Sequence, residues 1–376
     1  MSNVTKKIFV LNAQPGGNKG AEAMLETVLH FLTENFQNYK ILVESLNDSP
    51  AYEAFKNRTN FDIEFIRFSP KNFLSPYEVT VSDVDIAIDI GGINYHDKSI
   101  KANLRNYIRH SFFIRNRARL IFFTQDFGPC EKLTTKIFAK LIYRKAEAIF
   151  MRSKKSRELL TQTIRSNHIY GPYPDCTLLM KPEENSRIIE EDYFVVSPSA
   201  IMYNEYGYEY LSKLADSIVD INAKSIVPVF LVHNFTSNGE TSDKEVTSKL
   251  FKLCENKGVK GILKNEELSP AQLKQILNGS LFSLTSRYHV VVGSFSCNTP
   301  SISIGWSHKY QEFMDLYNCK HLNLNYGGTL SESVLDAVNE LTSNNFFNEE
   351  IKAKNNLLKN RAEMSFECLK KTIDKS

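Results

Sequence analysis

The sequence predicts an α/β protein with two Rossmann-like, doubly wound domains that face a cleft. Short apolar runs alternate with amphipathic stretches from the start, which is typical of βαβ units and parallel sheets. The polar segment 181–187 interrupts this alternation, which then restarts. A chain of 376 residues is also too long for one ordinary core and suits two domains.

In the first half, buried strands are predicted at 8–11, 41–43, 63–68, 84–90, 120–124, 148–151 and 168–170. Helices are predicted between several of these strands, at 21–36, 132–145 and 154–163. The segment 1–182 is therefore expected to form an N-terminal α/β domain, with 181–187 as a linker.

In the second half, strands are predicted at 193–196, 226–232, 259–263, 280–284 and 301–304. The helices predicted between them are 211–219, 244–255, 271–277 and 290–297. We expect a C-terminal α/β domain over 190–345, followed by a C-terminal helix over 346–376. Acidic and basic residues nearly balance in that last helix, so packing on a domain is favoured over a basic membrane-surface helix.

Composition excludes several classes of function. The net charge is only +3, which argues against broad neutralisation of nucleic-acid phosphates. The six cysteines are scattered without a CxxC pair, so we expect reduced thiols and neither disulfides nor a zinc site. The apolar run 8–11 is too short for a signal-peptide core, and no run approaches the length of a membrane span. The cytoplasm is the default compartment, with the inner face of the membrane as an alternative.

The segment Ser286-Arg287-Tyr288-His289 is the most informative motif, because a strand ends there and a helix begins. Ser286 is predicted to be the helix N-cap. Free amide groups in a first helical turn favour an anion, and Arg287 adds positive charge there. His289 can move a proton near neutral pH. A capped helix with surface charges is the alternative interpretation.

Other loops also follow predicted strands, at the edge where open α/β sheets bind ligands. The first, Gly16 to Leu25, is glycine-rich around Asn18 but matches neither GxGxxG nor a Walker A loop. The second contains Gly91 and Gly92, followed by His96 and Asp97. Residues 125–129 form a third. Arg152 ends a further strand, where an arginine is well placed to bind a carboxylate or phosphate, and Asp175 lies in a later loop. No metal-binding constellation and no Gly-x-Ser-x-Gly motif is present.

Taken in order, these segments resemble the polysaccharide pyruvyl transferase family along nearly the whole chain. The matching pieces are Asn18 to Leu25, Gly91-Gly92, residues 125–129, Met151-Arg152 with Ser156, Asp175, Ser286 to His289, and residues 300–304 leading to Lys309. The chain departs from the family pattern at Ala21, usually acidic, at Ile93, usually glycine, and at Tyr288, usually leucine.

The resemblance implies a glycosyltransferase-B-like fold. It also implies transfer of pyruvate from phosphoenolpyruvate onto two hydroxyls of one sugar, giving a cyclic ketal in the biosynthesis of a surface polysaccharide such as an exopolysaccharide or capsule. Phosphoenolpyruvate is then a donor substrate, no separate cofactor is required, and no nucleic acid is bound. The acceptor sugar could be lipid-linked, nucleotide-linked or polymeric. The N-terminal domain is the expected acceptor side.

The same resemblance assigns roles to residues. Arg152 and Arg287 are the expected partners of the donor's two anionic groups, and His289 is the expected general acid or base. Asp97 is a weaker candidate for activating the sugar hydroxyl. Lys309 adds positive charge at the rim, and Asn18, Gly91, Gly92 and Ser286 complete the predicted substrate-binding set. Two alternatives stay open: a glycosyltransferase that uses a nucleotide sugar, and a non-catalytic sugar-binding protein.

Overall fold

A computed structural model describes residues 6–45, 49–68, 81, 83–184, 186–236, 241–305, 307–327, 329–343 and 346–375. These residues form two compact units. Unit 1 comprises Met1–Gly16, Met24–Cys176 and Arg361–Ser376, and unit 2 comprises Gly17–Ala23 and Thr177–Asn360. The short segment 17–23 therefore belongs with the second half of the sequence. That a cleft lies between the two halves stays a prediction.

Unit 1 contains a seven-stranded parallel sheet in the order β3-β2-β1-β4-β5-β6-β7. Its strands are β1 (Lys6–Leu11), β2 (Tyr39–Ser45), β3 (Ile63–Arg67), β4 (Ile86–Asp89), β5 (Arg119–Gln125), β6 (Ala148–Met151) and β7 (Ile169–Tyr170). The chain builds outward from β1 in one direction and from β4 in the other. The strand order therefore reverses between β1 and β4, which is the place where doubly wound sheets bind ligands.

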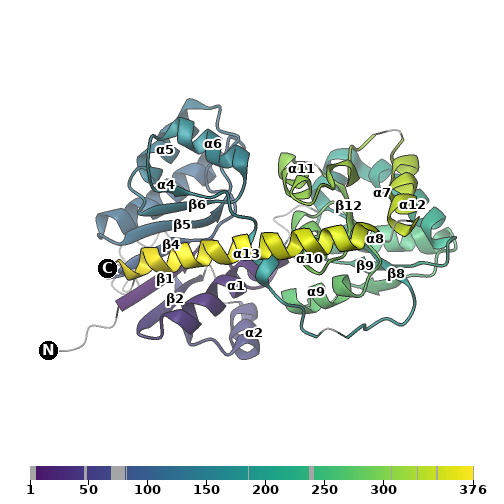
Figure 1. Cartoon of the computed structure of the whole chain (residues 1–376), viewed down its shortest axis with the longest axis horizontal. Coiled ribbons are helices and arrows are strands. Elements are labelled where there is room, and N and C mark those ends of the chain that lie inside the picture. Colours follow the sequence, from purple (N-terminus) through teal and green to yellow (C-terminus); the bar gives the residue numbers. More distant parts are fainter. Residues whose placement is uncertain are drawn as a thin grey trace. The chain divides into compact units, whose positions relative to one another are not determined.

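The helices of unit 1 are α2 (Pro50–Thr59), α4 (Ile100–Arg115), α5 (Leu133–Tyr143) and α6 (Lys154–Thr163), together with most of α1 (Lys19–Asn35) and the end of α13 (Phe346–Asp374). Figure 1 shows α4, α5 and α6 next to the strands β4 to β6. The core between helices and sheet is strongly aromatic. Phe122 and Tyr143, for example, have ring centroids 4.6 Å apart, and both side chains are almost fully buried.

Unit 2 repeats the same architecture with a six-stranded parallel sheet in the order β10-β9-β8-β11-β12-β13. The strands are β8 (Tyr193–Ser197), β9 (Val227–Leu231), β10 (Ile262–Lys264), β11 (Ser283–Thr285), β12 (Ser301–Ile304) and β13 (Asn323–Leu324). The helices are α7 (Ala200–Asn222), α8 (Asp243–Asn256), α9 (Pro270–Asn278), α10 (Tyr288–Ser296), α11 (His308–Asp315) and α12 (Leu330–Ser343). The order reverses between β8 and β11.

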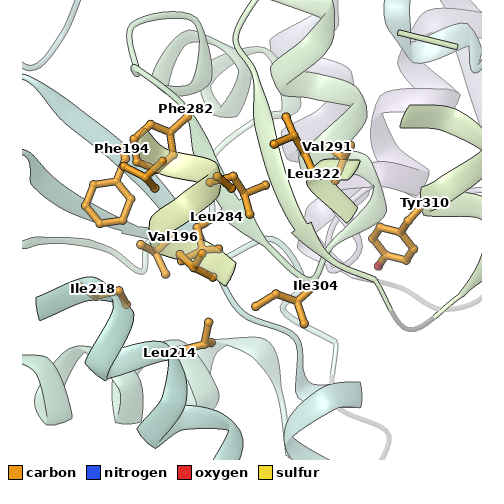
Figure 2. Close-up of a cluster of buried hydrophobic side chains, with 14 of the residues drawn as sticks. Phe194, Val196, Leu214, Ile218, Phe282, Leu284, Val291, Ile304, Tyr310 and Leu322 are labelled. Atoms are coloured by element: carbon orange, nitrogen blue, oxygen red, sulfur yellow. The ribbon is translucent and has the colours of Figure 1, made fainter. Parts of the chain in front are cut away.

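The core of unit 2 connects the sheet to the segment that carries the predicted site. Figure 2 shows Phe194 of β8 beside Phe282, just before β11, and these rings stack with centroids 5.1 Å apart. Tyr310 lies at another side of the same cluster. Its hydroxyl donates to the backbone oxygen of Ser286 at 2.8 Å. The start of α10 is thereby tied to α11.

Most predicted elements are present, and the prediction of two parallel α/β sheets is confirmed. The extent of α7 differs most from expectation. The predicted helix 211–219 forms only part of it, and Tyr203 to Tyr210 are also helical up to and beyond a kink at Gly207. Gly207 adopts a left-handed φ of 62°, which glycine tolerates without cost to a side chain.

Candidate active site

The carboxyl edge of the unit 2 sheet gathers three segments that are far apart in sequence. His233 follows β9, and Arg287 follows β11. The segment 17–23 joins them, because the amide of Lys19 donates to the carbonyl of His233 at 3.3 Å and the amide of Phe235 donates to Gly17 at 2.9 Å. Two of the predicted motifs, around Asn18 and around Arg287, are therefore parts of one site.

Gly20 and His289 are in direct contact. A Cβ atom at Gly20 would lie 2.0 Å from Nδ1 of His289, far inside van der Waals distance. Only glycine leaves room for the imidazole at the first turn of α1. His289 itself stands on the first turn of α10 and is half-buried.

A second histidine lies beside the first. The rings of His233 and His289 are parallel, with an angle of 2° between them and centroids 6.2 Å apart. The pKa of His233 lies well below its ordinary value, first because burial disfavours its charged form, and second because His289, Arg287 and Lys19 repel a further charge. The electrostatic effects of His289, Arg287 and Lys19 therefore converge on His233.

Carboxylates orient both cations of the site. Lys19 is almost completely buried and pairs with Glu22 at 2.8 Å and with Glu267 at 2.9 Å. Arg287 donates through Nη2 to the buried Asp243. Among the described residues Nε of Arg287 has no hydrogen-bond partner, so the guanidinium retains a donor for a ligand.

The prediction that Ser286 caps α10 is wrong. Arg287 occupies the N-cap position, and no side chain caps the helix. Ser286 is fully buried, and its hydroxyl is hydrogen-bonded to that of Tyr210 at 2.9 Å. Through this bond to Tyr210, the buried Ser286 fixes the position of the Ser286–His289 motif.

Two other predicted site residues also belong to unit 2. Asn18 is exposed and caps α1, because its side-chain oxygen accepts from the amides of Gly20 at 3.1 Å and Ala21 at 3.4 Å. Lys309 places its ammonium group 4.9 Å from the ring centroid of Tyr288. A leucine at position 288 could not provide that cation–π contact.

Behind the two histidines lies a cavity of about 30 Å³, lined in part by Lys19, His233, Lys274 and His289. That volume suits one or two water molecules, since one water needs on the order of 10–15 Å³ by this measure. It is too small for a sugar or for phosphoenolpyruvate. Lys274 in the lining donates to the carbonyls of Thr177 at 2.6 Å and Met180 at 2.7 Å.

Unit 1 has a separate buried polar network where β1 and β4 end. Asp89, the last residue of β4, is fully buried and contacts Nε2 of His110 at 2.6 Å. Nδ1 of His110 is hydrogen-bonded to the hydroxyl of Tyr95 at 2.9 Å. Burial alone would raise the pKa of Asp89, but the hydrogen bond and charge of His110 outweigh it, so the pKa is lowered.

Gly91 and Gly92 form the loop held by this network. The amide of Gly91 donates to Oδ1 of Asp89 at 2.8 Å. A Cβ at Gly91 would meet Cβ of Asn12 at 2.9 Å, so the loop can only pass this close to the end of β1 with glycine there. At Gly92 a Cβ would have ordinary contact, 3.6 Å, with Arg152.

Arg152 is engaged by two carboxylates. Its Nε donates to Asp126 at 2.8 Å and its Nη1 to Asp175 at 2.7 Å, and Nη2 also contacts Asp126. All three guanidinium nitrogens thus bond to carboxylates of unit 1. Two carboxylates, of Asp126 and Asp175, face the single positive charge of Arg152. This geometry gives Arg152 a structural role, and its contact with a donor stays a prediction.

Asp97 is likewise occupied. Its carboxylate accepts the amides of Glu131 and Lys132 just before α5. Burial would raise its pKa, but the hydrogen bonds from Glu131, Thr135 and Lys132 lower it instead. A carboxylate stabilised in this way is a weak base, and its role in activating a sugar hydroxyl stays a prediction.

Sequence reasoning missed His233, Asp243 and the Asp89–His110 pair. His233 directly follows a predicted strand, which was the available signal. Asp89 lies at the end of an apolar run, where a buried acid is unusual. Asp243 and His110 gave no comparable signal, because their roles arise from contacts with residues 44 and 21 positions away.

Both units have the Rossmann-like strand order, and the fold is of the glycosyltransferase-B-like class. Similar solved structures include one from Listeria monocytogenes described as a putative UDP-N-acetylglucosamine 2-epimerase, with TM-score 0.68, 10% identity and coverage of 99% of this chain and 97% of that one. The enzyme of that name from Neisseria meningitidis, bound to UDP-GlcNAc, gives TM-score 0.64, 9% identity and coverage of 98% and 99%. At these identities the likeness concerns the fold alone.

The chain belongs to the polysaccharide pyruvyl transferase family, whose model matches residues 18–308. That range includes both the Asn18 segment and the whole Ser286 to His289 motif. No curated protein matches the chain in sequence. In the described part of the chain, no helix is long and apolar enough to cross a membrane.

Proposed function

We propose that this protein transfers the pyruvyl group of phosphoenolpyruvate to two hydroxyls of a sugar, and that unit 2 binds the donor. The observation that carries this proposal is the convergence of Lys19, Arg287 and His289 around His233. Phosphoenolpyruvate bears a carboxylate and a phosphate, so it needs at least two cationic partners. Arg287, whose Nε has no hydrogen-bond partner among the described residues, supplies one, and Lys19, which also pairs with Glu22 and Glu267, supplies the other.

The reaction needs a proton at the methylene carbon of phosphoenolpyruvate. His289 donates that proton, and positive charge then develops at the adjacent carbon, which bears the phosphate. One sugar hydroxyl bonds to this carbon, and phosphate leaves. The second hydroxyl then bonds to the same carbon and closes the ketal. Of the two hydroxyl protons, one replaces the proton given by His289 and the other leaves with phosphate.

Acid–base catalysis of this kind contributes roughly 10²–10⁴-fold to a rate. His289→Ala should therefore lower turnover by that order while phosphoenolpyruvate still binds. His30→Ala is a matched control, because His30 lies on α1 but is exposed. Wild-type turnover in His289→Ala would remove this residue from the proposed chemistry.

The direct test of the function is release of phosphate from phosphoenolpyruvate with and without acceptors. Lipid-linked, nucleotide-linked and polymeric sugars should be compared, because the acceptor's form is open. We expect release only when one of them is present. Thermal stabilisation by nucleotide sugars, with none by phosphoenolpyruvate, would instead favour a glycosyltransferase. Binding of sugar without any turnover would favour a non-catalytic protein.

A further inference from the structure

The outer face of α4 and α5 exposes an unusual concentration of large apolar side chains. Of the twelve such residues exposed in the described chain, five lie on these two helices. They are Ile100 (57% exposed), Leu104 (45%), Leu133 (72%), Ile137 (45%) and Leu141 (48%). We call these five residues the apolar face. Isolated exposed apolar residues need no explanation, but a group of them marks an interaction site.

The five residues lie on one continuous surface. α4 and α5 pack side by side (Figure 1) and run in the same direction, since Asn103 bonds to Thr135 at 3.2 Å and Tyr107 packs on Phe138 with ring centroids 5.2 Å apart. On each helix the exposed residues recur every four positions, so they form one stripe per helix. The Tyr107–Phe138 contact joins the two helices.

Basic residues flank the apolar face, and neither helix contains an acidic residue. The exposed basic side chains on and directly after the helices are Lys101, Arg105, Arg115 and Arg117 of the α4 stretch, and Lys136, Lys140, Arg144 and Lys145 of the α5 stretch. The nearest acids in sequence, Asp97, Glu131 and Glu147, lie outside the helices. Asp97 accepts the amides of Glu131 and Lys132, and Glu147 is within 3.4 Å of Arg119. This combination complements a surface that is negatively charged and apolar just beneath.

We propose that the α4–α5 face docks unit 1 onto a membrane that contains anionic phospholipids. Aliphatic side chains would enter the boundary between headgroups and acyl chains, and the lysines and arginines would contact lipid phosphates. In an interface between two proteins, each surface more often carries charges of both signs, whereas α4 and α5 carry only basic ones. The inner face of α4 bonds to residues on either side of the Gly91–Gly92 loop, since Asn106 donates to the carbonyl of Asn94 and His110 contacts Asp89.

The C-terminal helix fits this role less well, although the sequence left it open. α13 exposes Leu357 (56%) and Met364 (52%), but these are seven positions apart. Acidic residues occur near the start of the helix and in its second half, among them Glu350, Glu363 and Glu367. Like charge would repel these positions from an anionic surface. Leu357 and Met364 are therefore matched controls for exposed apolar residues.

The test is sedimentation of the full chain with vesicles of phosphatidylcholine alone or mixed with phosphatidylglycerol. We expect binding only to the mixed vesicles, and weaker binding at high salt. Leu133→Gln with Ile137→Gln should abolish it, whereas Leu357→Gln with Met364→Gln should not. Lys136→Gln with Lys140→Gln should weaken it roughly 25-fold, since each basic residue contributes about a fivefold factor.

Absence of binding to the mixed vesicles overturns the proposal, as does binding that the α5 variants do not change. A dimer of the wild-type chain that Leu133→Gln with Ile137→Gln converts to monomer would overturn it too, because the face would then join two copies. Turnover of phosphoenolpyruvate with a water-soluble acceptor should be unchanged in all these variants. The proposal can therefore fail or hold independently of the proposed reaction.

Discussion

Gly20 and His289 fit together so closely that the imidazole occupies the space of a missing side chain. A Cβ at Gly20 would come within 2.0 Å of Nδ1 and 2.3 Å of Cγ of the ring. The contact joins the beginning of α1 to the beginning of α10, 269 positions later. The absence of a side chain at one residue therefore sets the position of the proposed proton donor at the other.

Gly20→Ala should displace His289 and lower turnover roughly 10²–10⁴-fold, as expected for loss of acid catalysis. Alanine is a better helix former than glycine by about 1 kcal/mol, so any loss of stability must come from this contact. Steady-state kinetics of Gly20→Ala, His289→Ala and the double variant measure the effect. If the double variant were far slower than His289→Ala alone, the two residues would act separately.

Arg287→Ala should weaken phosphoenolpyruvate binding roughly 10- to 100-fold, because a charge-assisted hydrogen bond is worth about 1.5–3 kcal/mol. Calorimetric titration measures the affinity, with the exposed Lys260→Ala as control. The variant also leaves Asp243 buried beside no cation, which costs stability. Adding Asp243→Asn should restore stability but not affinity. Recovery of affinity in the double variant would contradict the anion-binding role.

Stability should fall as the pH drops below about 6.5, the ordinary pKa of histidine. The pKa of His233 is depressed in the folded protein, so the unfolded chain binds a proton that the folded one refuses. The contribution of His233 to the free energy of unfolding is fully present at pH values above the pKa of the unfolded chain. It declines as the pH falls towards the lower pKa of the folded protein, by about 1.4 kcal/mol per pH unit at most. The pKa of His96 is also lowered in the folded protein, so His96 adds to the same loss of stability at low pH. Denaturant titrations at several pH values should show a shallower decline for His233→Gln and an unchanged one for His30→Gln.

His110→Phe should destabilise the protein by about 3–5 kcal/mol, because it removes one partner of a fully buried pair and leaves Asp89 behind. Phosphoenolpyruvate affinity should not change if unit 2 alone binds the donor. Urea unfolding and calorimetry measure the two effects. The exposed His308→Phe is the control. A large loss of donor affinity in His110→Phe would place donor binding in unit 1 as well.

The strands could be predicted from sequence because buried parallel strands are short apolar runs, as at 148–151 and 301–304. α4 was missed for a physical reason. Its buried side is polar, with Asn103, Asn106, Arg109 and His110 facing the loops that they hold. The pattern therefore lacks the apolar stripe by which an amphipathic helix is predicted.

The motif residues Arg287 and His289 could be named from the sequence because a strand end followed by a helix start is a local feature. Their partners could not. Glu267 reaches Lys19 across 248 positions, and no local pattern connects them. For Arg152 the residue type suggested anion binding. The structure shows that it pairs with Asp126 and Asp175, and its contact with a donor stays a prediction. Charge alone does not distinguish a ligand site from an internal ion pair.

The most direct measurement follows the carbon at which the ketal would form. Phosphoenolpyruvate labelled with ¹³C at C2 should be incubated with the protein and a library of sugar acceptors, and the products followed by NMR. We expect the label to move into a saturated ketal carbon on a sugar, with one phosphate released per label and none of this in His289→Ala. Label that stays in phosphoenolpyruvate with every acceptor, or that appears only as free pyruvate, would contradict pyruvyl transfer by this protein.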